Sequence, residues 1–203
     1  MGITSVEARE VLEEFHPRIR RIVERAWSEW RTVAQLRADA GLSPVLYRRT
    51  VANDVFDAIA RYAIVEFGDD PHASLKIESQ TIKLFFRAKL LARFKRAGDK
   101  KLGRNIPTQA VMSFIDADAL LPGMPPETGK VEFVWISNDI QTQLEKVLVI
   151  ARDGDCLIWE YEIAAEMAET GEVVPFPHPH RDDTDDDMVR ARIPDTQEPK
   201  EKE

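Results

Sequence analysis

The spacing of apolar residues changes at Pro71, and this change most limits what the chain can fold into. Between residues 6 and 67, apolar side chains recur at intervals of three or four positions, which is typical of amphipathic helices. After Pro71, Leu75 and Ile77 alternate with charged residues, as in a strand that has one exposed face. A helical half followed by a strand-forming half predicts an α+β fold, in which helices pack on a sheet.

Two kinds of helix breaker divide the helical half. Pro17 lacks an amide hydrogen and disfavours helix in the residue before it, so we expect a break there and a longer helix that opens at Pro17. Gly41 is a stop signal for this helix. A second helix should begin at Pro44 or Tyr47 and end at Phe67. The two helices predict a hairpin that packs on the sheet.

The apolar stripe of the first helical stretch fits two different partners. It can pack against the chain's own sheet, or it can form a short coiled-coil seam with a second copy and so make a homodimer. Glu29 interrupts the seam at a position where an apolar residue is expected. Trp27 and Trp30 would cover the rest of the face in the first case and anchor the dimer in the second. The sequence leaves both alternatives open.

The strand-forming half, residues 71–170, predicts a small antiparallel sheet of about four or five strands. Residues 82–90 fit either strand or helix, and Thr108 is a plausible cap for a short helix. Asp153-Gly154 is a strong signal for a tight turn. The candidate strands are the segment after Pro71 and residues 90–96, 131–137, 145–151 and 156–163. Together with residues 1–70, this region is expected to form one globular domain.

Charge is distributed unevenly along the chain. The 203 residues carry a formal net charge of −8, yet Arg87–Arg104 contains eight lysines and arginines and the single acid Asp99. If residues 90–96 form a strand, alternation places Arg93 and Lys95 on one face. Such a surface suits phosphate oxygens. The candidate nucleic-acid or anion-binding residues are Arg93, Lys95, Arg96, Lys100, Lys101, Arg104, Asn105 and Thr108.

Three explanations of this basic segment remain open. It can bind nucleic acid or another polyanion, it can bind an acidic protein partner, or its charges can simply keep an exposed sheet edge soluble. Residues 171–203 contain five prolines and a cluster of aspartates, and we expect a disordered acidic tail there. One hypothesis is that this tail shields the basic segment when no partner is bound.

Signatures of enzymes and of membrane proteins are mostly missing from the sequence. No phosphate-binding GxxxxGK loop, GxGxxG fingerprint, HExxH helix or GxSxG elbow occurs. A single cysteine excludes an internal disulfide, and no run of about 18 apolar residues could span a membrane. We therefore expect a cytoplasmic protein without a cofactor or a metal site. Of the four histidines, His72 is the plausible catalytic acid or base.

Several short segments together resemble a group of uncharacterised bacterial and phage-borne proteins. They are Arg93-Phe94-Lys95, residues 103–109, the Leu121-Pro122-Gly123 turn and the hairpin ending in Trp159-Glu160-Tyr161. The resemblance covers about residues 48–163. Such proteins are often encoded beside a repressor-like helix–turn–helix protein or a regulator-cleaving zinc protease. The resemblance implies a role in a prophage, defence or toxin–antitoxin operon, and it supplies no catalytic residue.

Two functions from different classes follow as expectations. The first is a non-enzymatic regulatory or interaction module of a small operon, which binds nucleic acid or an operon-encoded partner through the basic segment. The second is a toxin-like effector, such as a metal-independent ribonuclease, that would use His72 with the same basic residues. A helix–turn–helix reading of the hairpin is disfavoured, although Arg48 and Arg49 stand near the start of the second helix. The helices are too long for that motif.

Overall fold

The N-terminal helices of the computed structural model begin and end where local signals place them. The structure describes residues 2–78, 81–98, 100–103 and 108–165. Helix α1, Ser5–Leu12, starts with a capping box in which Thr4 and Glu7 bond reciprocally. A 3₁₀ turn, η1 (Glu13–Phe15), then separates it from helix α2, His16–Asp39, which has Pro17 in its first turn. The expected break before Pro17 is confirmed.

Helices α2 and α3 (Arg48–Phe67) form the predicted hairpin. Gly41 has a φ of +69°, and its amide and that of Leu42 donate to the carbonyls of Ala38 and Arg37. This is the Schellman arrangement, which satisfies carbonyls at the end of α2. Two ion pairs hold the helices antiparallel: Arg18 Nε lies 2.7 Å from Glu66, and Arg61 Nη2 lies 2.6 Å from Glu29.

One mixed sheet of six strands follows, in the order β1-β2-β3-β4-β5-β6. All neighbouring strands are antiparallel except β3 and β4, which are parallel. The prediction of an α+β fold is confirmed, but a purely antiparallel sheet of four or five strands is not. The strands are β1 (Ala73–Glu78), β2 (Thr81–Phe86), β3 (Leu90–Arg96), β4 (Gly129–Ser137), β5 (Leu144–Asp153) and β6 (Cys156–Glu162).

The ambiguous segment 82–90 contains strand β2 and the turn that follows it. Ile82, Leu84 and Phe86 are buried on one face of the sheet, while the residues between them are half-buried on the other. Arg87 and Ala88 both have positive φ, and the amide of Lys89 donates to the carbonyl of Phe86. This is a type I′ hairpin turn built without glycine or asparagine, so the usual sequence signal for it is missing.

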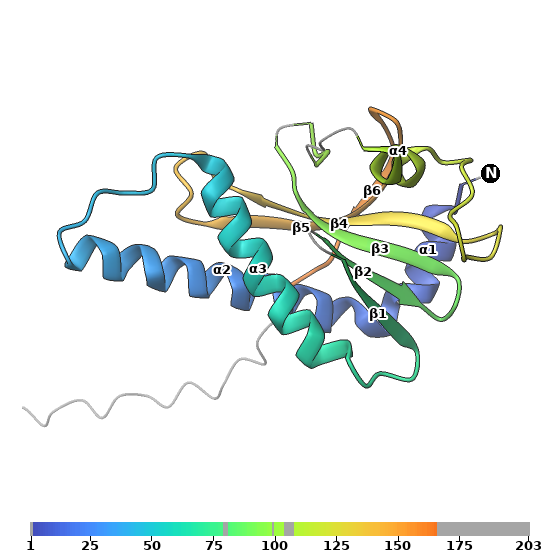
Figure 1. The fold of residues 1–203 in the computed structure, drawn as a ribbon, viewed down its shortest axis with the longest axis horizontal. Helices are drawn as coiled ribbons and strands as arrows, with labels where there is room; N and C mark the ends of the chain where they lie inside the picture. Colours follow the sequence, from blue (N-terminus) through green and yellow to red (C-terminus); the bar gives the residue numbers. More distant parts are fainter. Residues whose placement is uncertain (1, 79–80, 99, 104–107, 166–203) are drawn as a thin grey trace, which may run out of the picture. The chain divides into compact units, whose positions relative to one another are not determined.

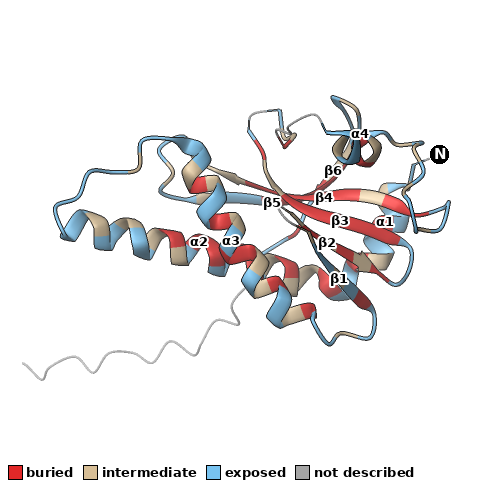
Figure 2. Ribbon diagram, viewed as in Figure 1, coloured by how far each residue is buried: buried red, intermediate tan, exposed pale blue. Residues whose placement is uncertain are grey.

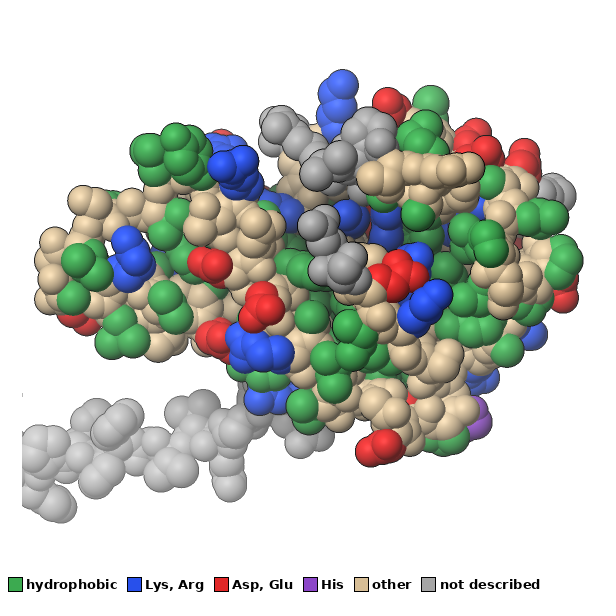
Figure 3. Space-filling view, viewed as in Figure 1, with side chains coloured by type: hydrophobic (Ala, Val, Ile, Leu, Met, Phe, Trp, Pro, Cys, Tyr) green, Lys and Arg blue, Asp and Glu red, His purple; other side chains and the backbone are tan. Residues whose placement is uncertain are grey.

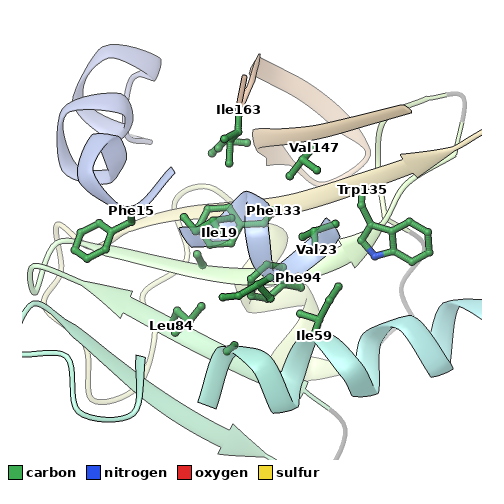
Figure 4. Packing of buried hydrophobic residues seen from close by; sticks show 14 of the residues in the cluster. Phe15, Ile19, Val23, Ile59, Leu84, Phe94, Phe133, Trp135, Val147 and Ile163 are labelled. Carbon is green, nitrogen blue, oxygen red and sulfur yellow. The ribbon is translucent and has the colours of Figure 1, made fainter. Parts of the chain in front are cut away.

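Helices α1, α2 and α3 cover one face of the sheet (Figure 1). The main core lies between these layers, where Ile19 and Val23 from α2 and Ile59 from α3 meet Phe94 and Phe133 of the sheet (Figure 4). Burying each of these side chains contributes about 1.5–3 kcal/mol. The buried residues of α2 also include Trp27 and Trp30, so most of the predicted stripe packs within its own chain (Figure 2).

The opposite face of the sheet is partly covered by the connection between β3 and β4. This connection includes helix α4, Gln109–Ile115, whose Phe114 and Ile115 pack on Leu91. It returns the chain to the start of β3, so that Leu90 pairs with Gly129 and the two strands run parallel. Residues 1–166 form one compact unit. The predicted tail, residues 171–203, lies outside the described residues.

Candidate anion-binding site

Strand β3 separates its basic residues by the alternation of its side chains. Ala92 and Phe94 belong to the core beneath the helices. Arg93 and Lys95 therefore point to the opposite face, as the sequence predicts. That face is covered at this point, because Arg93 is only 3% exposed and its guanidinium lies 4.1 Å from the centre of the Phe114 ring. The expectation that Arg93 belongs to an exposed basic stripe is thus wrong, because helix α4 covers Arg93.

Arg93 is part of an interior charged cluster with Glu132 and Arg152. The parallel register of β3 and β4 puts Glu132 beside Arg93, and Glu132 Oε1 accepts bonds from Arg93 Nε at 3.0 Å and Nη2 at 2.6 Å. Arg152 Nη1 lies 3.7 Å from Glu132 Oε2. Glu132 is fully buried, and a buried carboxylate needs such partners to remain charged. Sequence analysis missed Glu132 and Arg152 because their strands are remote from Arg93 in the chain.

Lys95 lies at the margin of this cluster and is half-buried. Burial lowers the pKa of its ammonium group, and the neighbouring Arg93 and Arg152 lower it further. Within the described part of the chain, Lys95 has no hydrogen bond or ion pair. Its electrostatic attraction is to Glu132, which opposes the lowering of its pKa.

Arg96, the last residue of β3, turns to the other side of the sheet and meets the start of α3. Its Nη1 donates to the carbonyl of Arg48 at 2.9 Å, and its Nη2 lies 3.3 Å from the hydroxyl of Ser137. The guanidinium also lies over the ring of Trp135. Burial and the nearby Arg48 lower the pKa of Arg96. This contact places Arg96 beside Arg48 at the start of α3.

The start of α3 adds two exposed arginines, Arg48 and Arg49, to this place. Helix α3 has no side-chain cap and no acid in its first turn, so the positive end of its dipole is not neutralised locally. Among the described residues, the carboxylate paired with Arg48 is Asp139, 3.8 Å away and 91% exposed. Figure 3 shows lysine and arginine side chains gathered around this end of α3 and between α3 and α4.

We call Arg48, Arg49, Lys95, Arg96 and Lys100 the basic group. Lys100 is exposed in the loop that follows β3. Lys95, Arg96 and Lys100 were expected from the basic segment. Arg48 and Arg49 instead come from the start of α3, where sequence analysis noted them without assigning them to a site. Their signal is the pair of consecutive arginines without a neighbouring acid.

The other predicted residues have different places. Lys101 forms an ion pair with Glu160, so its charge is already matched. The hydroxyl of Thr108 accepts a bond from the amide of Val111 and caps α4, as predicted. Arg104 and Asn105 lie outside the described residues.

His72 is not brought to the basic group. Its backbone bonds to Asp70 and to Arg87, next to the β2–β3 turn. That turn precedes Leu90, whereas Arg96 is at the far end of the same strand. At about 3.3 Å per residue, β3 alone separates the two ends by about 20 Å. His72 is therefore far from Lys95 and Arg96 in this fold, and a role for it in an effector stays a prediction.

Exposed apolar side chains border the basic group on the α2–α3 connection. Leu42, Leu46 and Tyr47 are 54%, 81% and 60% exposed, and the last two directly precede Arg48 and Arg49. Arginine and tyrosine are enriched in protein interfaces. The arrangement combines positive charge with apolar surface.

Within the described ranges, no group of three metal-ligating side chains is found. Nor does any helix there have both the length and the apolar character needed to cross a membrane. Comparison with known proteins gives no match to a family model, to a curated protein or to a solved structure.

Proposed function

We propose that this chain is a non-enzymatic regulatory or interaction module that binds nucleic acid through the basic group. The observation that carries the proposal is the meeting of Arg48, Arg49 and Arg96 at an uncapped helix start, where the neighbouring carboxylate of Asp139 is almost fully exposed. Arginines and helix N-termini are frequent donors to backbone phosphates. A role in a small operon, implied by the resemblance of residues 48–163, fits such a module.

The effector alternative receives less support. A metal-independent ribonuclease needs an acid or base within hydrogen-bond reach of the scissile phosphate. His72 is at the opposite end of β3 from Lys95 and Arg96. We therefore do not assign catalysis to this surface.

Fluorescence anisotropy of labelled RNA and DNA with the full chain tests the proposal, at about 50 and about 200 mM salt. Each phosphate contact contributes about −0.9 to the slope of log K against log salt concentration. The double substitution Arg48→Ala and Arg49→Ala should weaken binding and make this slope less steep by about 1.8. The matched control is Lys76→Ala with Lys89→Ala, which removes the same charge from two exposed positions elsewhere.

An unchanged affinity in the Arg48→Ala and Arg49→Ala variant, or an equal loss in the control, would remove the basic group from the proposal. Absence of binding by the unmodified chain at about 50 mM salt would reject nucleic acid as the partner.

A second candidate function, capture of an acidic protein partner, is favoured by the exposed Leu42, Leu46 and Tyr47 beside the same arginines. An amphipathic peptide with glutamates on one face and leucines on the other is the appropriate probe. It should bind the full chain and lose affinity on Leu46→Ser as well as on Arg48→Ala. Failure to bind, or indifference to Leu46→Ser, would exclude this function.

A homodimer through the N-terminal helices stays a prediction. The buried residues of α2 include Ile19, Ile22 and Trp27, whereas Val33 and Leu36 of the stripe are exposed. Light scattering of the chain with and without Leu36→Ser decides whether these two side chains pair copies.

A further inference from the structure

Among the described residues, the sheet face opposite the three N-terminal helices carries more positive than negative charge in its interior. Arg93 and Arg152 are 3% and 7% exposed, Lys95 is half-buried beside them, and Glu132 is the carboxylate enclosed with them. Asp155 also pairs with Arg152 at 3.1 Å, but its side chain is fully exposed. Charges buried without a partner are costly, so the excess needs an explanation.

The two arginines have their bonding groups engaged. Arg152 donates from Nε to the carbonyl of Gly154 at 2.7 Å and from Nη1 to the carbonyl of Gly103 at 3.1 Å. Arg93 is bound to Glu132 through two nitrogens. Both guanidiniums are thus fixed in place, and they act on their surroundings mainly through their electric field.

Among the described residues, Lys95 is the cation of this face that makes no hydrogen bond or ion pair. Glu132, the enclosed carboxylate, attracts Lys95 only through space: its Oε1 is bonded to Arg93, and its Oε2 accepts no hydrogen bond within the described part of the chain. Burial lowers the pKa of Lys95 and the two arginines add to this effect, while Glu132 opposes it.

The stem of Lys95 is held by the loop that follows β3. A methyl group at Gly103 would lie 2.7 Å from Cβ and 3.0 Å from Cγ of Lys95, so the glycine backbone packs directly on the lysine. The same residue pairs with Ala97 and accepts the bond from Arg152. The loop backbone therefore fixes the direction in which the lysine side chain leaves the strand.

We infer that Lys95 is the contact residue of an anion site that takes a phosphate group, with Arg93 and Arg152 supplying the surrounding positive field. The inference deepens the proposed function and rests on it, because the phosphodiester of a nucleic acid is the phosphate that would reach this site. It also assigns separate roles: Lys95 binds the anion, whereas Arg93 positions the cluster.

The test measures unfolding of the full chain by urea in chloride and in inorganic phosphate of equal ionic strength. A bound ion stabilises in proportion to the logarithm of its concentration once it exceeds the dissociation constant. Phosphate also stabilises proteins non-specifically, so the informative quantity is the difference between variants. We expect phosphate to raise the urea midpoint of the unmodified chain clearly more than that of Lys95→Met.

Lys89→Met is the matched control, since it removes one exposed lysine that lies outside the basic group, next to the other end of β3, and it should keep the full phosphate effect. Lys95→Gln repeats the test with a polar side chain in case Lys95→Met folds poorly. In chloride, Lys95→Met should have a midpoint at least as high as that of the unmodified chain, because it removes an unmatched charge.

An equal phosphate effect in the unmodified chain, Lys95→Met and Lys95→Gln would overturn the inference. Because this experiment contains no nucleic acid, its result is separate from that of the proposed function. A phosphate effect that depends on Lys95, in a chain that does not bind RNA or DNA, would keep the site and assign it to a small phosphorylated ligand.

Discussion

At the scale of single residues, the pairing of Arg93 with Glu132 is the strongest constraint on this surface. Glu132 is fully buried between strands and pairs with both Arg93 and Arg152. Removing one member of a buried ion pair leaves the other charge unmatched, which typically costs about 3–5 kcal/mol. The basic residues that sequence analysis grouped together therefore divide into two kinds. Some, such as Arg93, are paired inside the fold, and others are exposed and can contact a ligand.

Glu132→Ala should accordingly lower the free energy of unfolding by about 3–5 kcal/mol, measured by urea denaturation at neutral pH. The double variant Arg93→Leu with Glu132→Leu is the control, because it removes both charges and keeps apolar volume. It should recover a substantial part of the loss. If Glu132→Ala costs less than about 1 kcal/mol, the carboxylate is solvated and the cluster does not have the rigidity assigned to it.

Sequence analysis could assign Arg93 to a face but could not tell what covers that face. Alternation along Leu90–Arg96 is the same whether the second side meets water or a helix. The cover comes from Phe114 in α4, and the counter-charge comes from Glu132, whose register opposite Arg93 depends on a parallel pairing. Neither is encoded near Arg93. Lys95 is only partly exposed because the backbone of Gly103 packs on its side chain.

At the scale of elements, helices α2 and α3 are joined by the carboxylate of Glu29, which accepts hydrogen bonds from two donors on α3. Arg61 Nη2 donates to Glu29 Oε1 at 2.6 Å, and the hydroxyl of Tyr62 donates to Glu29 Oε2 at 2.8 Å. The bond from Arg61, followed by that from Tyr62, lowers the pKa of Glu29. Sequence analysis treated Glu29 as an interruption of an apolar seam, whereas in the fold it joins the two helices.

The bonds between Glu29 and helix α3 predict a specific pH dependence of the stability of the fold. Because the pKa of Glu29 is lower in the folded chain than in the unfolded one, its contribution is complete above the ordinary glutamate pKa and is lost as pH falls through the lowered value. Glu29 and Arg61 are both partly exposed, so the effect should stay below about 1 kcal/mol. Urea midpoints from pH 7 to pH 3 should show Glu29→Gln less stable than the unmodified chain at pH 7 and equal to it in acid.

The control for this measurement is Glu127→Gln, which changes an exposed glutamate outside the helical hairpin. It should follow the unmodified chain at every pH. A constant difference between Glu29→Gln and the unmodified chain across the whole range would show that packing, rather than the charge of Glu29, joins the helices.

The elements that could be predicted are those with local stop and start signals. Pro17, Gly41 and Thr108 each act within one turn of helix, and each marks a boundary in the structure. Strand β2 lacked such a signal, because its turn uses Arg87 and Ala88 at positive φ. The parallel pairing of β3 with β4 is decided by the path of the 97–128 connection, and the period of the side chains contains no information about strand direction.

At the scale of the whole molecule, the net charge is concentrated at one end of the chain. Residues 166–203 contain twelve acidic and five basic residues, so they account for seven of the eight net negative charges. The compact unit, residues 1–166, is therefore close to neutral overall while it presents the basic group on its surface. A net negative chain repels a polyanion at long range, and this repulsion opposes the local attraction of the basic group.

A chain that ends at Ala165 should bind labelled nucleic acid more tightly than the full chain, on the order of tenfold at about 50 mM salt. The difference should shrink at about 200 mM, since the Debye length falls and the distant charges are screened. Anisotropy titrations of both chains measure it, with the urea midpoint as a check that the shorter chain is folded. A full-length variant with asparagine at Asp182, Asp183, Asp185, Asp186 and Asp187 separates charge from length. If that variant binds like the unmodified chain while the shortened one binds more tightly, repulsion by these aspartates is not the cause.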